Sequence, residues 1–309
     1  GGESCDTEDQ NDITESFSEG IDIYRGNVTV SGSGKLLAEN VSDMAGGDLS
    51  FGLLISFGNL YVSGSAALTA TSYTAIEING GDIRLSGGRI SASETTIYGD
   101  AVSVGRNDYY NAGNGNIEIT GGELACVGNL RIRAQETDGM GILSITNGKL
   151  TAESISNKLI IANSTVISGR INANTVELQS GSLTVREPVY KSEYTNEFFA
   201  SYAISCKELT VSGGMLDAAW DWGEYAPSVL PADSYWGCAQ PLIKILNGTA
   251  SFGGGTVILD TGCAGNTALK AGTLNLSGGV RGSGYTNEDG SDTYIQSDGN
   301  TPVKFTVYP

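Results

Sequence analysis

The sequence of 309 residues contains no histidine and only five cysteines. The lack of histidine excludes Ser-His and Cys-His nucleophilic sites and zinc sites that contain histidine. An odd number of cysteines leaves at least one thiol free, so the chain is not a disulfide framework. We expect Cys126 and Cys206 to be core residues, because each lies two positions from an apolar residue. The sequence does not decide whether Cys238 and Cys263 form a disulfide bridge.

Basic residues are scarce as well. The chain has 17 lysines and arginines against 35 acids, which gives a net charge of −18. Nucleic acid is excluded as a partner, since phosphate binding needs clustered Lys and Arg. No apolar run approaches the roughly 20 residues that span a bilayer. We therefore expect no membrane insertion of this domain.

Proline is rare and glycine is abundant, with 6 prolines against 44 glycines. The glycines are not spread at random, as in a low-complexity chain, but follow short apolar pairs at regular positions. Glycine takes the positive φ that a sharp change of direction requires. We interpret these glycines as corners between strands.

The segment 74–93 shows the pattern most clearly. Apolar residues alternate with polar ones in three short runs, and Asn/Ser-Gly-Gly triplets separate the runs. A period of two places one set of side chains on one face of a strand. That set is Ile76, Ile78, Ile83, Leu85, Ile90 and Ala92. Antiparallel hairpins fit the same letters, so one copy does not decide the fold.

Repetition of the pattern does decide it. The signature apolar-x-apolar-[Ser/Thr/Asn]-Gly recurs, in places with substitutions, from Val28, Leu60, Ile83, Ile117, Leu143, Val176, Leu209 and Leu274. A period of about 20 to 50 residues is typical of a stacked array. The shortest step runs from Leu60 to Ile83, and it predicts the length of one coil. The step from Leu209 to Leu274 predicts two coils.

Stacked coils bring equivalent residues together. The eight apolar residues that begin the signature should form one column of the core. Arg84 should lie beside Glu118, and Glu123 should lie between Arg89 and Lys149, as pairs that help to set the register. We divide the chain into an acidic flexible segment at 1–20 and a parallel β-helix domain at 21–309.

Aromatic residues gather in a region that departs from the repeat. Loop insertions at about 186–240 contain all three tryptophans. Flat aromatic faces beside polar groups suit sugar rings. The candidate ligand-binding residues are Trp220, Trp222, Tyr225, Tyr235 and Trp236. The alternative interpretation is a satellite core that fixes two long loops to the array.

Two further features bear on ligands. Arg131 and Arg133 alternate with apolar residues, so both lie on an outer face, where they can grip a carboxylate or balance Glu77 and other acids on adjoining coils. The turn at 287–292 is rich in oxygen ligands but lacks the spacing of a calcium loop. We expect no catalytic residues and no resident cofactor or metal, with Ca²⁺ as the one ion left open.

The corner signature, as in the segments 26–36 (GNVTVSGSGKL) and 75–83 (AIEINGGDI), resembles right-handed parallel β-helices of the pectate-lyase-like type. Within that type it is similar to bacterial exported carbohydrate-binding β-helix proteins. The likeness covers about 21–280. It implies an all-β, single-stranded right-handed solenoid at the cell surface or secreted, in contact with polysaccharide. No catalytic or metal motif of the family matches residue by residue.

The sequence thus predicts a non-catalytic extracellular protein of a bacterium, acting as a monomer in polysaccharide binding or adhesion. Its expected partner is a polysaccharide or surface glycan. One alternative is a Ca²⁺-dependent lyase acting on acidic polysaccharide through Arg131 or Arg133. Another is a structural adhesin stalk.

Overall fold

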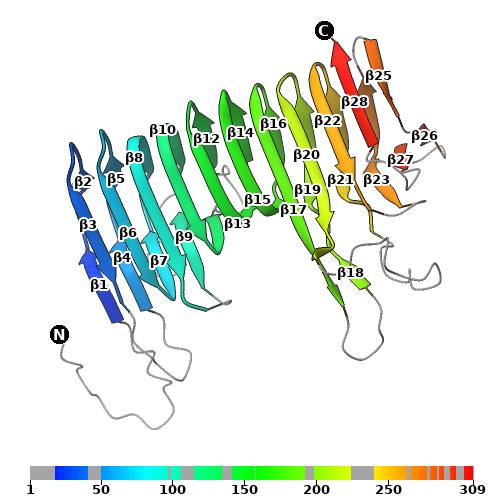
Figure 1. Ribbon diagram of the computed structural model, residues 1–309. Coiled ribbons are helices and arrows are strands. Elements are labelled where there is room, and N and C mark those ends of the chain that lie inside the picture. The colour runs from blue at the N-terminus through cyan, green and yellow to red at the C-terminus, as the bar shows by residue number, and fades with distance from the viewer. Residues whose placement is uncertain are drawn as a thin grey trace.

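A computed structural model describes residues 18–40, 50–96, 99–105, 115–133, 141–156, 158–191, 198–223, 240–262, 266–276, 279–283, 285–288, 293–296 and 303–308. Its 28 elements are all strands. The all-β class expected from the sequence is therefore confirmed for the part of the chain described. The strands stack side by side along one long axis, with the two ends of the chain at opposite ends (Figure 1).

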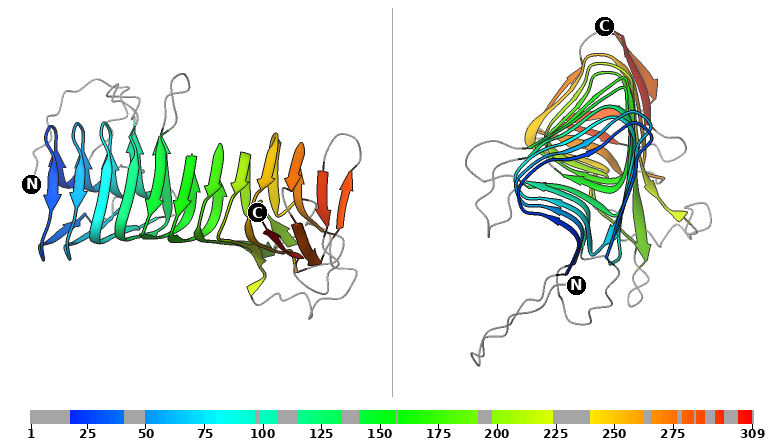
Figure 2. Two further views of the ribbon diagram at one scale, coloured as in Figure 1. Left: turned by 90° about the horizontal axis from the view of Figure 1, so that it is seen from above. Right: turned by 90° about the vertical axis from the view of Figure 1, so that its left-hand side faces the viewer.

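Each coil contributes strands to three ladders. The first coil consists of β1 (Ser18–Ile23), β2 (Val28–Val30) and β3 (Lys35–Glu39). Each pairs in parallel with its counterpart in the next coil, which is β4 (Ser50–Ile55), β5 (Leu60–Val62) and β6 (Ala67–Ser72) respectively. We call the stacks that begin at β1, β2 and β3 ladder 1, ladder 2 and ladder 3. Seen from one end, the coils overlie one another (Figure 2).

Short strands continue each ladder. Ladder 1 contains β7 (Thr74–Ile78), β9 (Asp100–Gly105), β11 (Asn129–Arg133) and β23 (Thr267–Ala271). Ladder 2 contains β12 (Ile142–Thr146), β14 (Lys158–Ala162), β16 (Thr175–Leu178) and β24 (Thr273–Leu276). Ladder 3 contains β17 (Gly181–Lys191), β20 (Met215–Asp221) and β22 (Gly255–Asp260).

Longer strands run around the corners and join the ladders. Ladders 2 and 3 share β8 (Ile83–Glu94) and β10 (Ile117–Val127). The strands β13 (Lys149–Ser156) and β15 (Ser164–Asn172) each begin in ladder 3 and end in ladder 1, where the next coil starts. Ladders 1 and 2 share β19 (Ile204–Val211) and β21 (Ile243–Phe252). The hydrogen-bonded strands therefore form one continuous sheet that encloses the core.

The predicted core column is confirmed. Leu60 pairs with Val28 on one side and Ile83 on the other. The column continues through Ile117, Leu143, Leu159, Val176, Leu209, Ala250 and Leu274. Every member from Leu60 to Ala250 is fully buried. Each larger side chain of this column contributes roughly 1.5–3 kcal/mol to the stability of the stack, because it is removed from water.

The predicted coil length is wrong. The signature in the sequence omits Leu159, which lies about midway along the chain between Leu143 and Val176 and pairs with both. The shortest coil therefore runs from Leu143 to Leu159, and it is shorter than the step from Leu60 to Ile83. It is short because β13 and β15 each supply a strand to two ladders without a loop between them.

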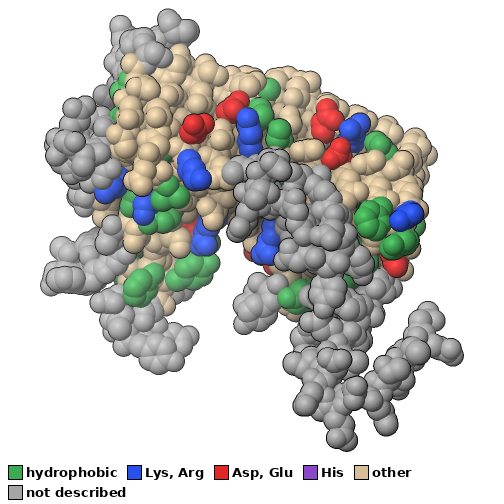
Figure 3. Space-filling view, turned by 180° about the vertical axis from the view of Figure 1, so that it is seen from behind, with side chains coloured by type: hydrophobic (Ala, Val, Ile, Leu, Met, Phe, Trp, Pro, Cys, Tyr) green, Lys and Arg blue, Asp and Glu red, His purple; other side chains and the backbone are tan. Residues whose placement is uncertain are grey.

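The charge pairs expected between coils are present. Arg84 lies 3.8 Å from Glu118. Glu123 forms ion pairs with Arg89 at 3.4 Å and with Lys149 at 2.9 Å. These groups are partly exposed, so each pair contributes at most about 1 kcal/mol. Elsewhere too, acidic and basic side chains are interspersed along one face of the molecule (Figure 3).

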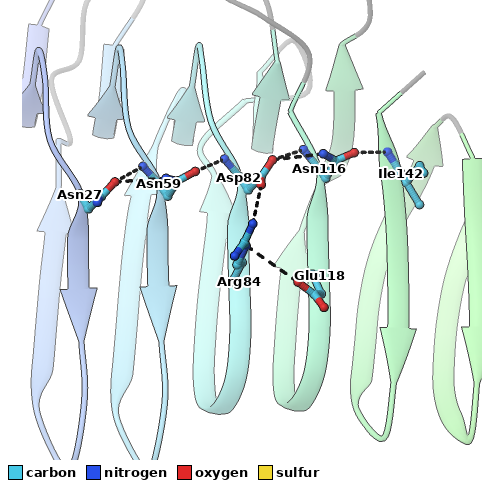
Figure 4. A network of polar contacts seen from close by, with 7 residues as sticks. All are labelled: Asn27, Asn59, Asp82, Arg84, Asn116, Glu118 and Ile142. Atoms are coloured by element: carbon cyan, nitrogen blue, oxygen red, sulfur yellow. Dashed lines mark hydrogen bonds and ion pairs between the residues drawn. The ribbon is translucent and has the colours of Figure 1, made fainter. Parts of the chain in front are cut away.

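A line of polar side chains follows ladder 2 at the start of its strands (Figure 4). The Oδ1 atom of Asn27 accepts the backbone N–H of Asn59 at 2.9 Å, and Asn59 Oδ1 accepts that of Asp82 at 2.8 Å. Asn116 Oδ1 accepts the N–H of Ile142 at 3.0 Å. Each side chain thus satisfies a backbone donor of the next coil.

Gly88 shows why glycine occupies a corner. Its φ is +76°, and a Cβ there would lie 2.2 Å from the carbonyl oxygen of Ala66 in the coil below. Only glycine permits this close approach together with a positive φ. The backbone of β8 can therefore turn from ladder 2 to ladder 3 without a break in the strand.

The predicted fold class, a single-stranded right-handed parallel β-helix (solenoid), is wrong beyond its all-β part. The C-terminal strands are β25 (Gly279–Ser283), β26 (Tyr285–Glu288), β27 (Thr293–Gln296) and β28 (Val303–Tyr308), and they pair antiparallel with one another and with β22 and β23. The strands also join in one sheet closed around the core, rather than remaining separate between tight corners. An end of the stack needs a cover, and reversal of direction lets β28 pair with β22.

Cys126 and Cys206 are buried and free, as expected for core residues. Burial raises the pKa of both thiols, that of Cys206 to about 12, so neither is a reactive thiolate. Cys238 and Cys263 lie outside the described residues, as does most of the acidic segment 1–20, since β1 begins at Ser18. Where the structure describes the chain, no helix is long and apolar enough to cross a membrane.

Candidate functional site

A groove of about 750 Å³ lies where ladder 3 passes into ladder 1. Four passes of the chain cross it, at 126–131, 151–156, 167–172 and 186–190. Neighbouring strands in a sheet lie about 4.8 Å apart. The groove therefore extends along the long axis over successive coils, and a ligand that fills it must be elongated in that direction.

The lining of the groove is more basic than the rest of the chain. It contains Arg131, Arg170 and Arg186 but only two acids, Glu153 and Glu187. The protein as a whole has about twice as many acids as basic residues. The lining thus holds one more basic than acidic residue, whereas the chain as a whole is strongly acidic, and this excess favours an anion.

Each of the three arginines is held by a carboxylate on a neighbouring strand. Arg131 lies 3.4 Å from Asp100, and Arg186 lies 2.6 Å from Asp217. The Arg170 Nε donates to Glu187 at 3.0 Å, and a second contact makes the pair bidentate. The hydrogen bond to Glu187 raises the pKa of Arg170.

These pairs orient the guanidinium groups without covering them. The arginine side chains are 52, 43 and 39% exposed, in the order Arg131, Arg170 and Arg186. Asp100 and Glu187, by contrast, are buried. A guanidinium has five N–H donors, so the contact with one carboxylate leaves others for a ligand, although Arg186 also donates through Nη1 to the carbonyls of Val185 and Asp217.

Asn129 ties the start of β11 to its neighbours. Its backbone N–H donates to Glu94 at 3.1 Å, and its Nδ2 donates to the carbonyl of Gly99 at 3.3 Å. Its Oδ1 accepts the hydroxyl of Ser154 at 2.5 Å. Gly128 precedes it, and a Cβ at Gly128 would lie 2.1 Å from the Glu94 carboxyl carbon. Glycine here lets the Glu94 side chain fold beside the groove.

Glu94 is the titratable group most affected by this arrangement. Burial raises the pKa of its carboxyl, and the negative charges of Glu153 and Asp100 raise it further. The hydrogen bond from Asn129 opposes the rise but is the smaller effect. Protonation of Glu94 is therefore easier than that of an ordinary glutamate.

Exposed apolar side chains border the groove. Val127 and Tyr190 are 60 and 59% exposed, and Ile167 is 38% exposed. Tyr190 lies on the part of β17 that continues past the corner and pairs antiparallel with β18 (Phe198–Ala200). The groove thus combines a flat aromatic ring with the three guanidinium groups.

Two of the candidate aromatic residues belong to the core. Trp220 and Trp222 are 3 and 7% exposed. Their Nε1 atoms donate to the carbonyls of Ser201 at 3.0 Å and Thr261 at 3.1 Å. The ring of Phe198 packs 6.0 Å from that of Trp222. Buried indoles do not fit a platform on which a ligand stacks, and both pack in the main core cluster rather than in a separate one.

The other candidates have different outcomes. Arg131 lies in the groove, although its partner Asp100 on the adjoining coil fits the charge-balancing interpretation. Arg133 is on β11, but its side chain is not described. Tyr225, Tyr235 and Trp236 lie outside the described residues. Within the described ranges, no three His, Cys, Asp or Glu side chains form a metal-binding group.

The site residues predicted from the sequence do not include Arg170, Arg186 or Tyr190. Arg170 lies in the coil that begins at Leu159, and the predicted repeat does not include that coil. Arg186 lies in the coil after it. A search for a shorter repeat would have aligned Ser154 with Arg170, as the register shows. That alignment places the arginines beside the corner where the groove forms.

Comparisons with models of protein families, with curated proteins and with solved structures found no match to this chain. They give no support to the resemblance to pectate-lyase-like β-helices, or to the carbohydrate binding and secretion that it implied. The resemblance is therefore withdrawn as an identification.

Proposed function

We propose that the protein binds an extended polysaccharide in the groove, without catalysis. The observation that carries the proposal is the set of three partly exposed guanidinium groups, each oriented by a carboxylate on a neighbouring strand. Orientation before binding lowers the entropy lost when a ligand is held. The proposal includes an extracellular or cell-surface location and a monomeric state.

The remaining lining supports a sugar ligand. Besides Tyr190, the groove offers the hydroxyl of Thr151 and the amide of Asn172, which match the hydroxyls of a sugar. A sugar ring can stack its C–H face on an exposed aromatic ring while its hydroxyls pair with polar neighbours. Four chain passes at the usual spacing cover about 14 Å, which is the length of a short oligosaccharide.

Affinity electrophoresis in gels that contain polygalacturonate, xylan or dextran tests the proposal. The test variant is Arg131→Gln and the matched control is Arg89→Gln. The two side chains are 52 and 57% exposed, and each lies 3.4 Å from one carboxylate, but Arg89 is not in the groove. We expect retardation of the unaltered protein by polygalacturonate. Arg131→Gln should weaken it about tenfold, as for loss of a charge-assisted hydrogen bond, and Arg89→Gln should not.

Three results would overturn the proposal. Free migration of the unaltered protein in all gels would favour the structural stalk. Equal weakening by both substitutions would show that the groove is not the site. Ultraviolet-absorbing unsaturated product from polygalacturonate with Ca²⁺ would favour a lyase over a binding protein.

A further inference from the structure

The outer side of ladder 1 extends beyond the groove as one column of side chains. Its register gives Ser156 beside Asn172, Asn172 beside Ser205, Ser205 beside Lys244, and Lys244 beside Lys270. At the other end, Leu130 pairs with Ile155, so Arg131 lies beside Ser156. The column from Arg131 to Lys270 thus begins in the groove and continues over the following coils.

The charge of this column changes along the long axis. Between β1 and β9 it consists of Asp22, which is exposed, and of Leu54, Glu77 and Ser103, which are buried. Ser103 then pairs with Arg131. From that point the column holds three basic residues and no acid. The basic half of the column therefore begins at β11 and is continuous with the groove.

A second polar cluster lies along the basic half. The Lys244 Nζ donates to the hydroxyl of Tyr202 at 2.8 Å and lies 4.8 Å from the centre of its ring. That hydroxyl donates to Gln240 Oε1 at 2.6 Å. Lysine and tyrosine are half-buried, and Gln240 is exposed. The ammonium group is thus oriented by its neighbours, as the guanidinium groups in the groove are.

We propose that Tyr202, Gln240 and Lys244 form a distal subsite, and that an anionic polysaccharide lies along ladder 1 from Arg131 to Lys244, parallel to the long axis. The proposal rests on the proposed function and adds the charge, direction and length of the ligand. Arg131 and Lys244 are four strand intervals apart, or about 19 Å at the usual spacing. A trisaccharide is too short to reach both, whereas a decasaccharide spans them.

Titration calorimetry with a trimer and a decamer of galacturonate tests the distal subsite. Linked contacts act at a high effective concentration, so the unaltered protein should bind the decamer more tightly than the trimer. Lys244→Met should weaken decamer binding about fivefold and leave trimer binding unchanged. Lys244→Arg should retain most of the decamer affinity. Lys35→Met, at an exposed lysine of ladder 3 in the first coil, is the control and should change neither.

Each other result has a definite meaning. Decamer binding that is unaffected by Lys244→Met overturns the distal subsite, even where trimer binding depends on Arg131. Equal loss of trimer and decamer binding overturns it too, because Lys244 would then act on the groove or on folding. Equal binding of a neutral decamer, or of a single-stranded oligonucleotide, overturns the assignment to an anionic glycan. Trimer binding that is absent or independent of Arg131 is instead a failure of the proposed function.

Discussion

Asp82 accepts two hydrogen bonds from Asn116 in the next coil, one from the backbone N–H at 3.0 Å and one from the side-chain Nδ2 at 3.2 Å. Both use the same carboxylate oxygen, while the other oxygen lies 3.2 Å from Arg84. Asp82 therefore accepts a backbone N–H of the next coil, as the asparagines in this line of side chains do. Unlike an asparagine, it also carries a charge, which pairs with Arg84 on the outer surface of ladder 2.

Asp82→Ala should lower the free energy of unfolding by about 1–3 kcal/mol, because the backbone N–H of Asn116 loses its acceptor in a partly buried position. Asp82→Asn keeps the acceptor and loses only an exposed ion pair, so it should cost less than about 1 kcal/mol. Urea unfolding of the two variants checks this. Equal destabilisation would show that the charge, rather than the hydrogen bonds, is what matters.

Ile83→Ala should lower the free energy of unfolding by about 2–5 kcal/mol, because it leaves a cavity between Leu60 and Ile117 in the core column. Ile167→Ala removes the same side chain from an outward position that is 38% exposed, and should change stability by about 0.5 kcal/mol or less. Denaturant midpoints distinguish them. A similar loss for both would contradict the inward column.

The sequence was sufficient to predict this column because a period of two fixes which side chains face inward, and glycine marks the corners. It was not sufficient for the short coils or for the C-terminal end. Leu159 is preceded by Lys158 without a glycine corner, so its copy of the repeat has no clear boundary. The antiparallel pairing of β28 satisfies the same alternation as parallel pairing would, and alternation does not encode strand direction.

Glu94 and Glu123 should give opposite pH dependences of stability. The folded-state pKa of Glu94 is raised above its ordinary value of 4.5 by burial. The native state then binds the proton first, so this group makes the protein more stable as the pH falls from neutral towards 4.5. The pKa of Glu123 is lowered, first by its hydrogen bond from Lys149. Its contribution is present above 4.5 and is lost at lower pH.

Urea midpoints from about pH 7 to about pH 3 test this pair of signs. Glu94→Gln should remove the gain in stability above pH 4.5, and Glu123→Gln should reduce the loss below it. The amide oxygen introduced by Glu94→Gln can still accept the N–H of Asn129. A fall in the stability of this variant at neutral pH would contradict the burial effect.

Arg170→Met should destabilise the protein by up to about 3 kcal/mol, because it leaves Glu187 as a buried, unpaired carboxylate. The exposed guanidinium keeps the value below that of a fully buried pair. Arg170→Met combined with Glu187→Met should recover much of the loss. Thermal unfolding of the single and double variants measures the coupling, and purely additive losses would contradict it.

The candidate site was harder to predict than the core. Trp220 and Trp222 are predicted as ligand-binding residues because aromatic residues gather in their region, but their N–H groups donate to backbone carbonyls. Composition does not distinguish a ligand platform from a buried aromatic pair. Arg131 was identified because it alternates with apolar neighbours. Its grouping with Arg170 depends on the register of three coils, and a small error in coil length hides it.

The central claim is that a polysaccharide lies along the corner between ladders 3 and 1, and hydrogen exchange with and without polygalacturonate tests it most directly. Ligand should slow exchange in the passes that line the groove, 126–131, 151–156, 167–172 and 186–190, and leave β2, β3 and β5 unchanged. Slowed exchange confined to the first two coils, under conditions where binding is saturated, would contradict the account.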